Sequence, residues 1–286
     1  MERPLEMVQT KVICVALGAL LLCSCAPRFS WEKFPMDGHR TGVGYLTADN
    51  VETALGTIEN GVYTSPNGTV FEGGATSLAA SDMMNVQPRM RELKKVIAYA
   101  PEEMVSRRPE SSLSDFLVDN LMDAVAEATG RSVDVGLMNF GGIRVNVPQG
   151  DVLMEDIVSM LPFKNYPVYV QLKGEDLTAL FEHLAKTGMQ VIAGAKVEID
   201  GGELVSFSVG GSPVDPEKLY GLATIDFLLD GGDGIYAAKN AKDLVILDKI
   251  LCDVILPRVT SLTEAGKPLE YKTDGRVIIR EKEAGR

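Results

Sequence analysis

Four short segments, far apart in the sequence, combine glycines with side chains suited to holding a small ligand. They are Arg107-Arg108-Pro109-Glu110-Ser111, Asn139-Phe140-Gly141-Gly142-Ile143-Arg144, Leu161-Pro162-Phe163-Lys164-Asn165 and Phe227-Leu228-Leu229-Asp230-Gly231-Gly232-Asp233-Gly234. Arginine makes forked bonds to phosphate, an asparagine amide both donates and accepts hydrogen bonds, and a carboxylate accepts them from hydroxyl groups. Glycine allows tight turns and the close approach of a backbone to a ligand. The chemistry these residue types favour is noncovalent recognition.

Each of these features also has a purely structural interpretation, which the residues alone leave open. The paired glycines at 141–142 and 231–232 would be turns between strands. Phe163 and Phe227 would be core residues, and the arginines would be solvated charges. The remaining chemistry-bearing residues are few: His39 and His183 are the only histidines, and both are expected at the surface. The sequence contains no phosphate-binding P-loop, no Cys/His metal cluster and no convincing Ser-His-Asp set.

The composition excludes several protein classes. The 286 residues are 45% hydrophobic and 24% charged, which argues against disorder, collagen and a coiled coil. The formal net charge of -12 argues against a protein that binds the backbone of DNA or RNA, because that requires a basic surface. It does not exclude a small anion held by a few local arginines.

The N-terminus reads as a processing segment. Lys11 precedes an apolar run, 12–22, that is shorter than the roughly 18–20 residues of a membrane-spanning helix. The run leads into Leu22-Cys23-Ser24-Cys25, which resembles a bacterial lipobox. We therefore expect residues 1–24 to be a lipoprotein signal peptide and Cys25 to carry the lipid. An ordinary signal peptide or an N-terminal anchor helix is the alternative.

These assignments predict the location of the protein. A lipidated cysteine anchors a protein to a membrane surface without spanning the bilayer. No acidic run follows Cys25, so we expect an outer-membrane lipoprotein that faces the periplasm. After cleavage Cys252 is the only other cysteine, so no internal disulfide is possible, and its apolar neighbours predict a core residue.

The elements that would position the four segments follow from periodicity and turn signals. Residues 25–91 have weak periodicity and Asn-Gly turns, and we expect a tether and an irregular or hairpin-containing lead-in. Residues 92–286 form the predicted domain, with amphipathic helices that end at Gly130 and Gly188. One expected helix is capped by Ser111 or Ser112 and ends at Gly130, and the other spans 175–186. The expected strands span 95–100, 133–138, 166–172, 191–199, 204–209, 219–224 and 277–279. Residues 243–256 fit a strand, a helix or both. Strands and helices mix without strict alternation, so the fold class is α+β with a mixed sheet and packed helices.

Taken in this order and spacing, the four segments resemble the C-terminal domain of the 5′-nucleotidase family. The resemblance covers roughly residues 94–280. It implies a domain that holds the nucleoside while a separate metallophosphatase domain cleaves the phosphate. By position, it implies that Phe163 and Phe227 sandwich the base, that Asn139 hydrogen-bonds it, that Asp233 accepts from the ribose hydroxyls, and that Arg107 and Arg144 face the phosphate.

Three positions depart from the family pattern or make the transfer of roles ambiguous. Arg107 has a neighbouring arginine, Arg108, that could take its place. Phe140 stands where the family usually has a small residue, and its ring would crowd the turn or line the pocket. Lys164 occupies a position that is commonly small or polar, and it would add a cation near the ligand.

The resemblance also predicts what this chain lacks. Family members that hydrolyse the phosphoester use a two-metal site built from several His, Asp and Asn residues. Two isolated histidines cannot supply such a site, so we expect no metal or other cofactor in this chain and divalent metals in a partner. Three hypotheses remain: the recognition component of a split 5′-nucleotidase, a lipid-anchored nucleotide-binding module, or a structural lipoprotein without a ligand.

Overall fold

The computed structural model describes residues 41–44 and 46–280. The predicted signal peptide, the lipidation site Cys25 and His39 lie outside the described residues. No helix within the described part of the chain is both long and apolar enough to cross a bilayer.

A five-stranded mixed sheet forms the centre of the larger part of the chain. Its strand order is β13 (Asp243–Ile246), β7 (Pro167–Lys173), β12 (Leu219–Ile225), β5 (Val135–Met138) and β8 (Val191–Ala193). Only β5 and β12 of these neighbours are parallel. The strands consist largely of buried apolar residues, because helices cover both faces of the sheet.

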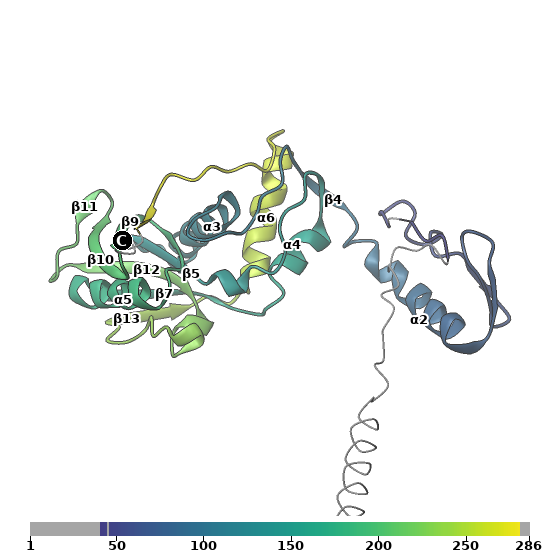
Figure 1. Ribbon diagram of the computed structural model, residues 1–286, viewed down its shortest axis with the longest axis horizontal. Helices are drawn as coiled ribbons and strands as arrows, with labels where there is room; N and C mark the ends of the chain where they lie inside the picture. Colours follow the sequence, from purple (N-terminus) through teal and green to yellow (C-terminus); the bar gives the residue numbers. More distant parts are fainter. Residues whose placement is uncertain (1–40, 45, 281–286) are drawn as a thin grey trace, which may run out of the picture.

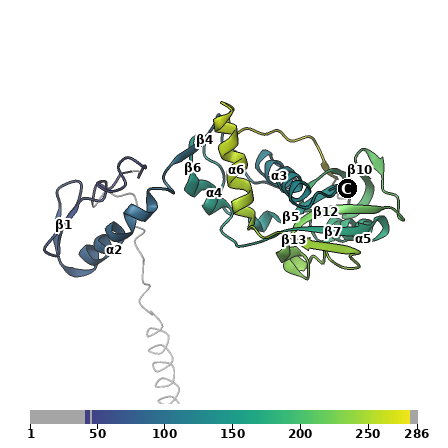
Figure 2. The ribbon, with the colours of Figure 1, turned by 180° about the vertical axis from the view of Figure 1, so that it is seen from behind.

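Helices α3 (Ser112–Thr129) and α5 (Gly174–Thr187) lie on opposite faces of this sheet (Figures 1 and 2). Gly136, Ala223 and Tyr169 are paired across three strands, so they share a face. A Cβ at Gly136 would lie 2.8 Å from side chains of α3, so α3 covers that face. Leu172 is three residues beyond Tyr169, points to the other face and contacts the hollow beside α5.

Both helices were predicted, and their local signals explain their ends. Ser111 and Ser114 form a reciprocal capping box at the start of α3, and Gly130 ends it in the left-handed conformation. Leu117 and Leu121 are fully buried along its inner side. The helix therefore has a fixed start, and this matters because the first of the four segments leads directly into it.

A second, four-stranded sheet packs against α5. Its strand order is β11 (Ser212–Pro213), β10 (Glu203–Val209), β9 (Ala195–Asp200) and β14 (Val277–Arg280). The rings of Phe181 on α5 and Phe207 on β10 stack with centroids 4.3 Å apart. The predicted hairpin at Gly201-Gly202 is confirmed as β9–β10.

The strand predicted over 191–199 is wrong as a single element. It divides at Gly194 into β8 and β9, which belong to different sheets. Gly194 has φ +68, and a Cβ there would lie 2.1 Å from the carbonyl oxygen of Asp134. The chain can make this change of sheet because glycine has no side chain.

The remaining elements of the larger part lie at one end of the central sheet. Strand β4 (Val96–Ala100) pairs with β6 (Gly150–Leu153), and α4 (Met154–Met160) follows. The ambiguous stretch from Asp243 is both a strand, β13, and a helix, α6 (Leu251–Glu264). Helix α6 packs on β4 and α3, and Cys252 at its start is buried as predicted.

The segment before β4 contains more regular structure than expected. Strands β1 (Thr57–Glu59), β2 (Val62–Thr64) and β3 (Val70–Glu72) form an antiparallel sheet, and α2 (Gly74–Met90) packs on it. Of the two alternatives for the lead-in, the structure has the hairpin, and it adds helix α2, which was not predicted. These elements form a group of their own (Figure 1).

Helix α2 was not predicted because several of its apolar residues are exposed while polar residues are buried, the reverse of the pattern in an amphipathic core helix. Its buried positions include Ser77 and Gln87, whereas Leu78, Met83 and Val86 are exposed. Apolar periodicity predicts a helix only when the apolar residues lie on the buried side.

Candidate functional site

Three of the four segments meet at one edge of the central sheet, where two strands end and a third begins. Parallel strands β5 and β12 finish at the same edge of the sheet, and the segments 139–144 and 227–234 follow them directly. Strand β7 is antiparallel to β12, and its first residue, Pro167, pairs with the last residue of β12, Ile225. The segment 161–165 therefore enters β7 at the same edge.

Asn139 and Asp233 form the centre of this edge. The Asn139 Nδ2 atom donates a 2.7 Å hydrogen bond to Asp233 Oδ2. Asn139 is only 4% exposed, and its Oδ1 atom is buried without a hydrogen-bond partner among the described residues. A buried amide oxygen that lacks a donor carries a desolvation cost, and this one lies in the side chain that binds Asp233 at the edge of the sheet.

The glycines beside Asn139 lie close to both polar side chains. A Cβ at Gly142 would lie 2.9 Å from Asn139 Oδ1. A Cβ at Gly141 would lie 3.4 Å from Asn139 Nδ2 and 3.6 Å from Asp233 Oδ2. The pair forms a turn, as the structural interpretation expected, and it also leaves room around the two polar side chains.

Phe163 and Phe227 are not core residues. Their exposed fractions are 47% and 45%, which is high for phenyl rings that a folded chain could have buried. The Arg144 guanidinium carbon lies 5.8 Å from the centroid of the Phe163 ring, and Arg144 Nη1 donates to the Gly141 carbonyl at 3.3 Å. Arg144 thus connects the segment around Asn139 with the segment around Phe163.

The neighbouring arginines Arg107 and Arg108 have different surroundings. The Arg108 guanidinium lies over the Phe140 ring, 4.6 Å from its centroid. It donates to the Met189 carbonyl and, at 3.4 Å, to Gln190 Oε1. The guanidinium of Arg107 is exposed and makes no hydrogen bond or ion pair with any described residue. Arg107 is therefore the one whose charge is available to a ligand.

Sequence reasoning missed Gln190, which supports the Asn139 turn. Gln190 is 8% exposed, and its Oε1 atom accepts from the Phe140 N–H at 3.1 Å as well as from Arg108. The Phe140 ring, for which the sequence left two placements open, is packed under Arg108. No sequence signal marks Gln190, because it precedes an ordinary buried strand.

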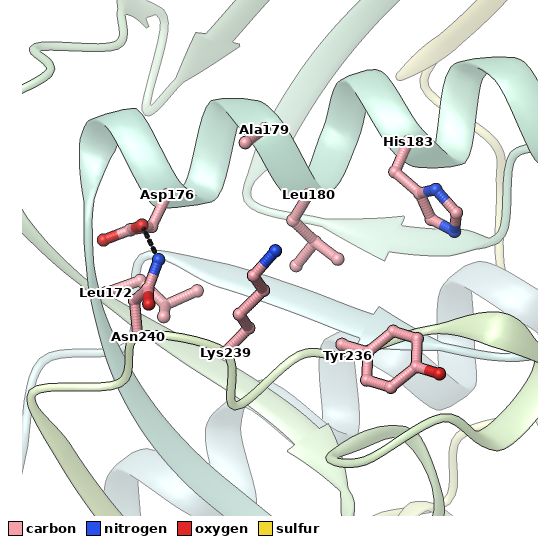
Figure 3. Close-up of a pocket in the computed structure, with 8 residues that line it drawn as sticks. All are labelled: Leu172, Asp176, Ala179, Leu180, His183, Tyr236, Lys239 and Asn240. Carbon is pink, nitrogen blue, oxygen red and sulfur yellow. Dashed lines mark hydrogen bonds between the residues drawn. The ribbon is translucent and has the colours of Figure 1, made fainter.

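His183 also has a structural partner in this region. It is exposed, as expected, but its Nε2 atom lies 2.9 Å from the Gly234 carbonyl oxygen, and this requires Nε2 to carry the proton. Figure 3 shows His183 at one end of a hollow of about 210 Å³ between α5 and the chain after Gly234. Tyr236, Lys239 and Asp176 also line the hollow, and Asn240 Nδ2 donates to Asp176 Oδ1 at 2.6 Å. The hollow contains none of the predicted site residues.

Three carboxylates lie close together at the start of α3 and in the C-terminal segment. Glu110, Asp115 and Asp274 have ligand-type oxygens within 4.8 Å of one another. Arg276 occupies this cluster: its Nε atom lies 2.9 Å from Asp274 Oδ1 and 3.7 Å from Asp115 Oδ2. An arginine already supplies the positive charge, so this donor set does not fit a catalytic metal.

Burial dominates the electrostatics of this cluster. Asp115 is 1% exposed, and burial raises its pKa to about 7, although Arg276 partly opposes the shift. Hydrogen bonds from Arg276 lower the pKa of Asp274. Arg276 also donates to the Ile192 carbonyl at 3.1 Å, so the cluster joins α3, β8 and the C-terminal segment.

The sequence profile of the family described as "5'-nucleotidase, C-terminal domain" matches residues 96–240, which is more than half of the chain. The chain belongs to this family. The 5′-nucleotidase C-terminal domain thus includes all four segments, and the resemblance predicted from them is confirmed.

The relatives of this domain are longer proteins. An apyrase from Tabanus yao is 26% identical over 253 residues, covering 74% of this chain and 45% of the apyrase. Protein UshA from Yersinia enterocolitica is 31% identical over 168 residues, covering 56% of this chain and 30% of UshA. The chain spans less than half the length of these relatives.

The fold is also that of solved 5′-nucleotidase structures. A 5′-nucleotidase precursor from Thermus thermophilus matches with a TM-score of 0.62 and 24% identity, over 71% of this chain and 43% of that chain. The NAD nucleotidase of Haemophilus influenzae matches with a TM-score of 0.55 and 15% identity, over 77% of this chain and 48% of that chain. The predicted α+β class, with a mixed sheet and packed helices, is confirmed.

Proposed function

We propose that this chain recognises nucleosides and nucleotides as the substrate-binding component of an extracytoplasmic 5′-nucleotidase. The observation that carries the proposal is the pair Asn139–Asp233, with its buried unpaired amide oxygen, at the edge where Phe163 and Phe227 expose their rings. Asn139 Oδ1 is one of four buried side-chain atoms without a partner among the described residues, and its place beside Asp233 and the exposed rings supports a ligand here.

Each group has a role suited to its chemistry. The two phenyl rings stack on the base, and stacking contributes about 1–3 kcal/mol per base with little base preference. Asn139 hydrogen-bonds the base, and Asp233 accepts from the ribose hydroxyls. Arg107 and Arg144 bind the phosphate, because guanidinium groups form forked bonds with phosphate oxygens.

Bond cleavage is assigned to residues outside this chain. A two-metal phosphoesterase centre needs several His, Asp and Asn ligands, and the sequence contains only two histidines. The chain's own residues bind and orient the nucleotide, and a metallophosphatase polypeptide holds the divalent metals. Exposed apolar side chains beside the site, such as Val145 at 42% and Tyr166 at 38%, support a surface that such a partner covers.

The anchoring and location are part of the same proposal. Cys25 carries a lipid that holds the protein on the periplasmic side of the outer membrane, where nucleotides from outside the cell would be captured. The lipobox-like order of residues 22–25 supports this placement.

The test is calorimetric titration of the purified protein with adenosine and with AMP. We expect both to bind, AMP more tightly, and Phe227→Ala to weaken adenosine about 5- to 150-fold, which corresponds to a lost stacking contribution. Tyr99→Ala is the matched control, because Tyr99 is a 54% exposed aromatic residue on β4, and it should leave both affinities unchanged.

A second measurement separates the split enzyme from a simple binding module. AMP hydrolysis is followed with the protein alone, with a metallophosphatase encoded beside it alone, and with both mixed. Hydrolysis that requires the mixture supports the split enzyme. Binding without any gain in the mixture supports the module instead, and absence of binding to either ligand refutes the proposed function.

A further inference from the structure

The side chain of Asp226 bridges the two segments that carry the aromatic rings. Its Oδ1 atom accepts hydrogen bonds from the backbone N–H of Tyr166 at 3.1 Å and from the backbone N–H of Phe227 at 2.8 Å. The Asp226 N–H in turn donates to the Tyr166 carbonyl at 2.9 Å. Neither the resemblance nor the four segments assigned a role to this residue.

The position of Asp226 in the sheet explains why one side chain can reach both segments. The pair Ile225–Pro167 ends the ladder between β12 and β7: Ile225 is the last residue of β12, and Pro167 is the first residue of β7. Beyond this pair the two segments leave the sheet. Phe227 lies two residues beyond Ile225, and Phe163 lies four residues before Pro167. Asp226 and Tyr166 continue the ladder by one further step, in which the Asp226 N–H donates to the Tyr166 carbonyl and the Asp226 carboxylate, in place of its carbonyl, accepts from the Tyr166 N–H.

The positions of the two rings depend on the backbone that carries them. Both phenyl rings are nearly half exposed, so core packing does not fix their positions. The backbone around them is tightly held: a Cβ at Gly232 would lie 1.9 Å from the Phe227 carbonyl oxygen, and Leu251 N–H donates to the Asn165 carbonyl at 2.8 Å. The direction in which each ring projects is therefore set by its backbone.

We propose that Asp226 is a positioning residue of the nucleoside site, which fixes the backbone from which Phe163 and Phe227 project and so sets the separation of the two rings. The inference rests on the proposed function for its effect on binding. A carboxylate oxygen accepts two N–H groups at once, and its charge strengthens both bonds. An asparagine at this position keeps an acceptor oxygen, whereas an alanine removes it.

The binding test compares Asp226→Ala with Asp226→Asn by calorimetric titration with adenosine. We expect Asp226→Ala to weaken binding about 10-fold, from two lost hydrogen bonds near the rings, and Asp226→Asn to stay within about threefold of wild type. In the Phe227→Ala background, Asp226→Ala should weaken binding by a smaller factor than in wild type, because the part of its effect that passes through the Phe227 ring is already lost. An equal loss in both backgrounds would overturn the inference.

A readout that needs no ligand keeps this inference separate from the proposed function. Hydrogen exchange of the Tyr166 and Phe227 amides should speed up in Asp226→Ala and stay slow in Asp248→Ala, a control acid with an exposed side chain. Unchanged exchange in Asp226→Ala overturns the positioning role. If wild type binds no nucleoside, the proposed function fails, and the exchange rates alone decide whether Asp226 holds the two backbones.

Discussion

Asp115 makes the stability of this domain depend on pH in an unusual direction. Burial raises its pKa from 3.8 to about 7, so the folded protein keeps a proton that the unfolded chain releases near pH 4. The stabilisation is complete below pH 4 and disappears as the pH rises to about 7. At about 1.4 kcal/mol per pKa unit, the loss between pH 5 and pH 8 amounts to about 2.5 kcal/mol.

The perturbation is Asp115→Asn, which removes the titrating group and keeps a side chain of similar shape. We expect the free energy of unfolding of wild type to fall between pH 5 and pH 8 by about 2.5 kcal/mol more than that of Asp115→Asn. Asp156 also has a pKa raised by burial, so part of the wild-type slope remains in the variant. Asp274 has a lowered pKa and contributes no slope above pH 4.

The assay is urea unfolding at pH 5, 6, 7 and 8, provided that both proteins unfold in a single transition. Asp123→Asn is the matched control, because Asp123 is an exposed acid on the same helix, and its slope should equal that of wild type. Equal slopes for wild type and Asp115→Asn would refute the reasoning, since they would mean that Asp115 is ionised in the folded protein at pH 5.

Two further predictions concern the arginine pair and a glycine. Arg107→Ala should weaken AMP about 10-fold and leave adenosine unchanged in calorimetric titration, because in the proposed binding mode its free guanidinium contacts only the phosphate; an equal loss for both ligands would contradict this role. Arg108→Ala should instead lower the midpoint of thermal unfolding, because its contacts with Phe140 and Gln190 are structural. Gly194→Ala should destabilise the fold by at least about 2 kcal/mol in urea unfolding, since its Cβ would overlap a backbone carbonyl, whereas Gly210→Ala meets open space and should cost about 1 kcal/mol from its positive φ alone.

The sequence predicted the elements whose apolar residues lie on the buried side. Both predicted helices have that pattern, and α3 and α5 match them closely. Helix α2 has the opposite pattern and was missed. The change of sheet at Gly194 was also missed, because an apolar run of strand-forming residues has the same appearance on either side of the break.

The candidate site was predicted through the resemblance, and the strand pairing explains why its segments meet. No periodicity reveals that the ends of β5 and β12 and the start of β7 share one edge. The choice between Arg107 and Arg108 needed the position of the Phe140 ring. Gln190 and Asp226 act on backbone N–H groups of distant segments, and such partners leave no mark on the residues around them.

The hydrogen bond between Asn139 and Asp233 joins residues that are 94 positions apart. Such a contact exists only when both distant segments are in their native places, so the site needs the folded domain. A nucleoside would then bind the finished domain and no partly folded form of it, and by mass action it would favour the native state. Removal of the nucleoside would then lower the stability of the whole domain, and not only empty one site.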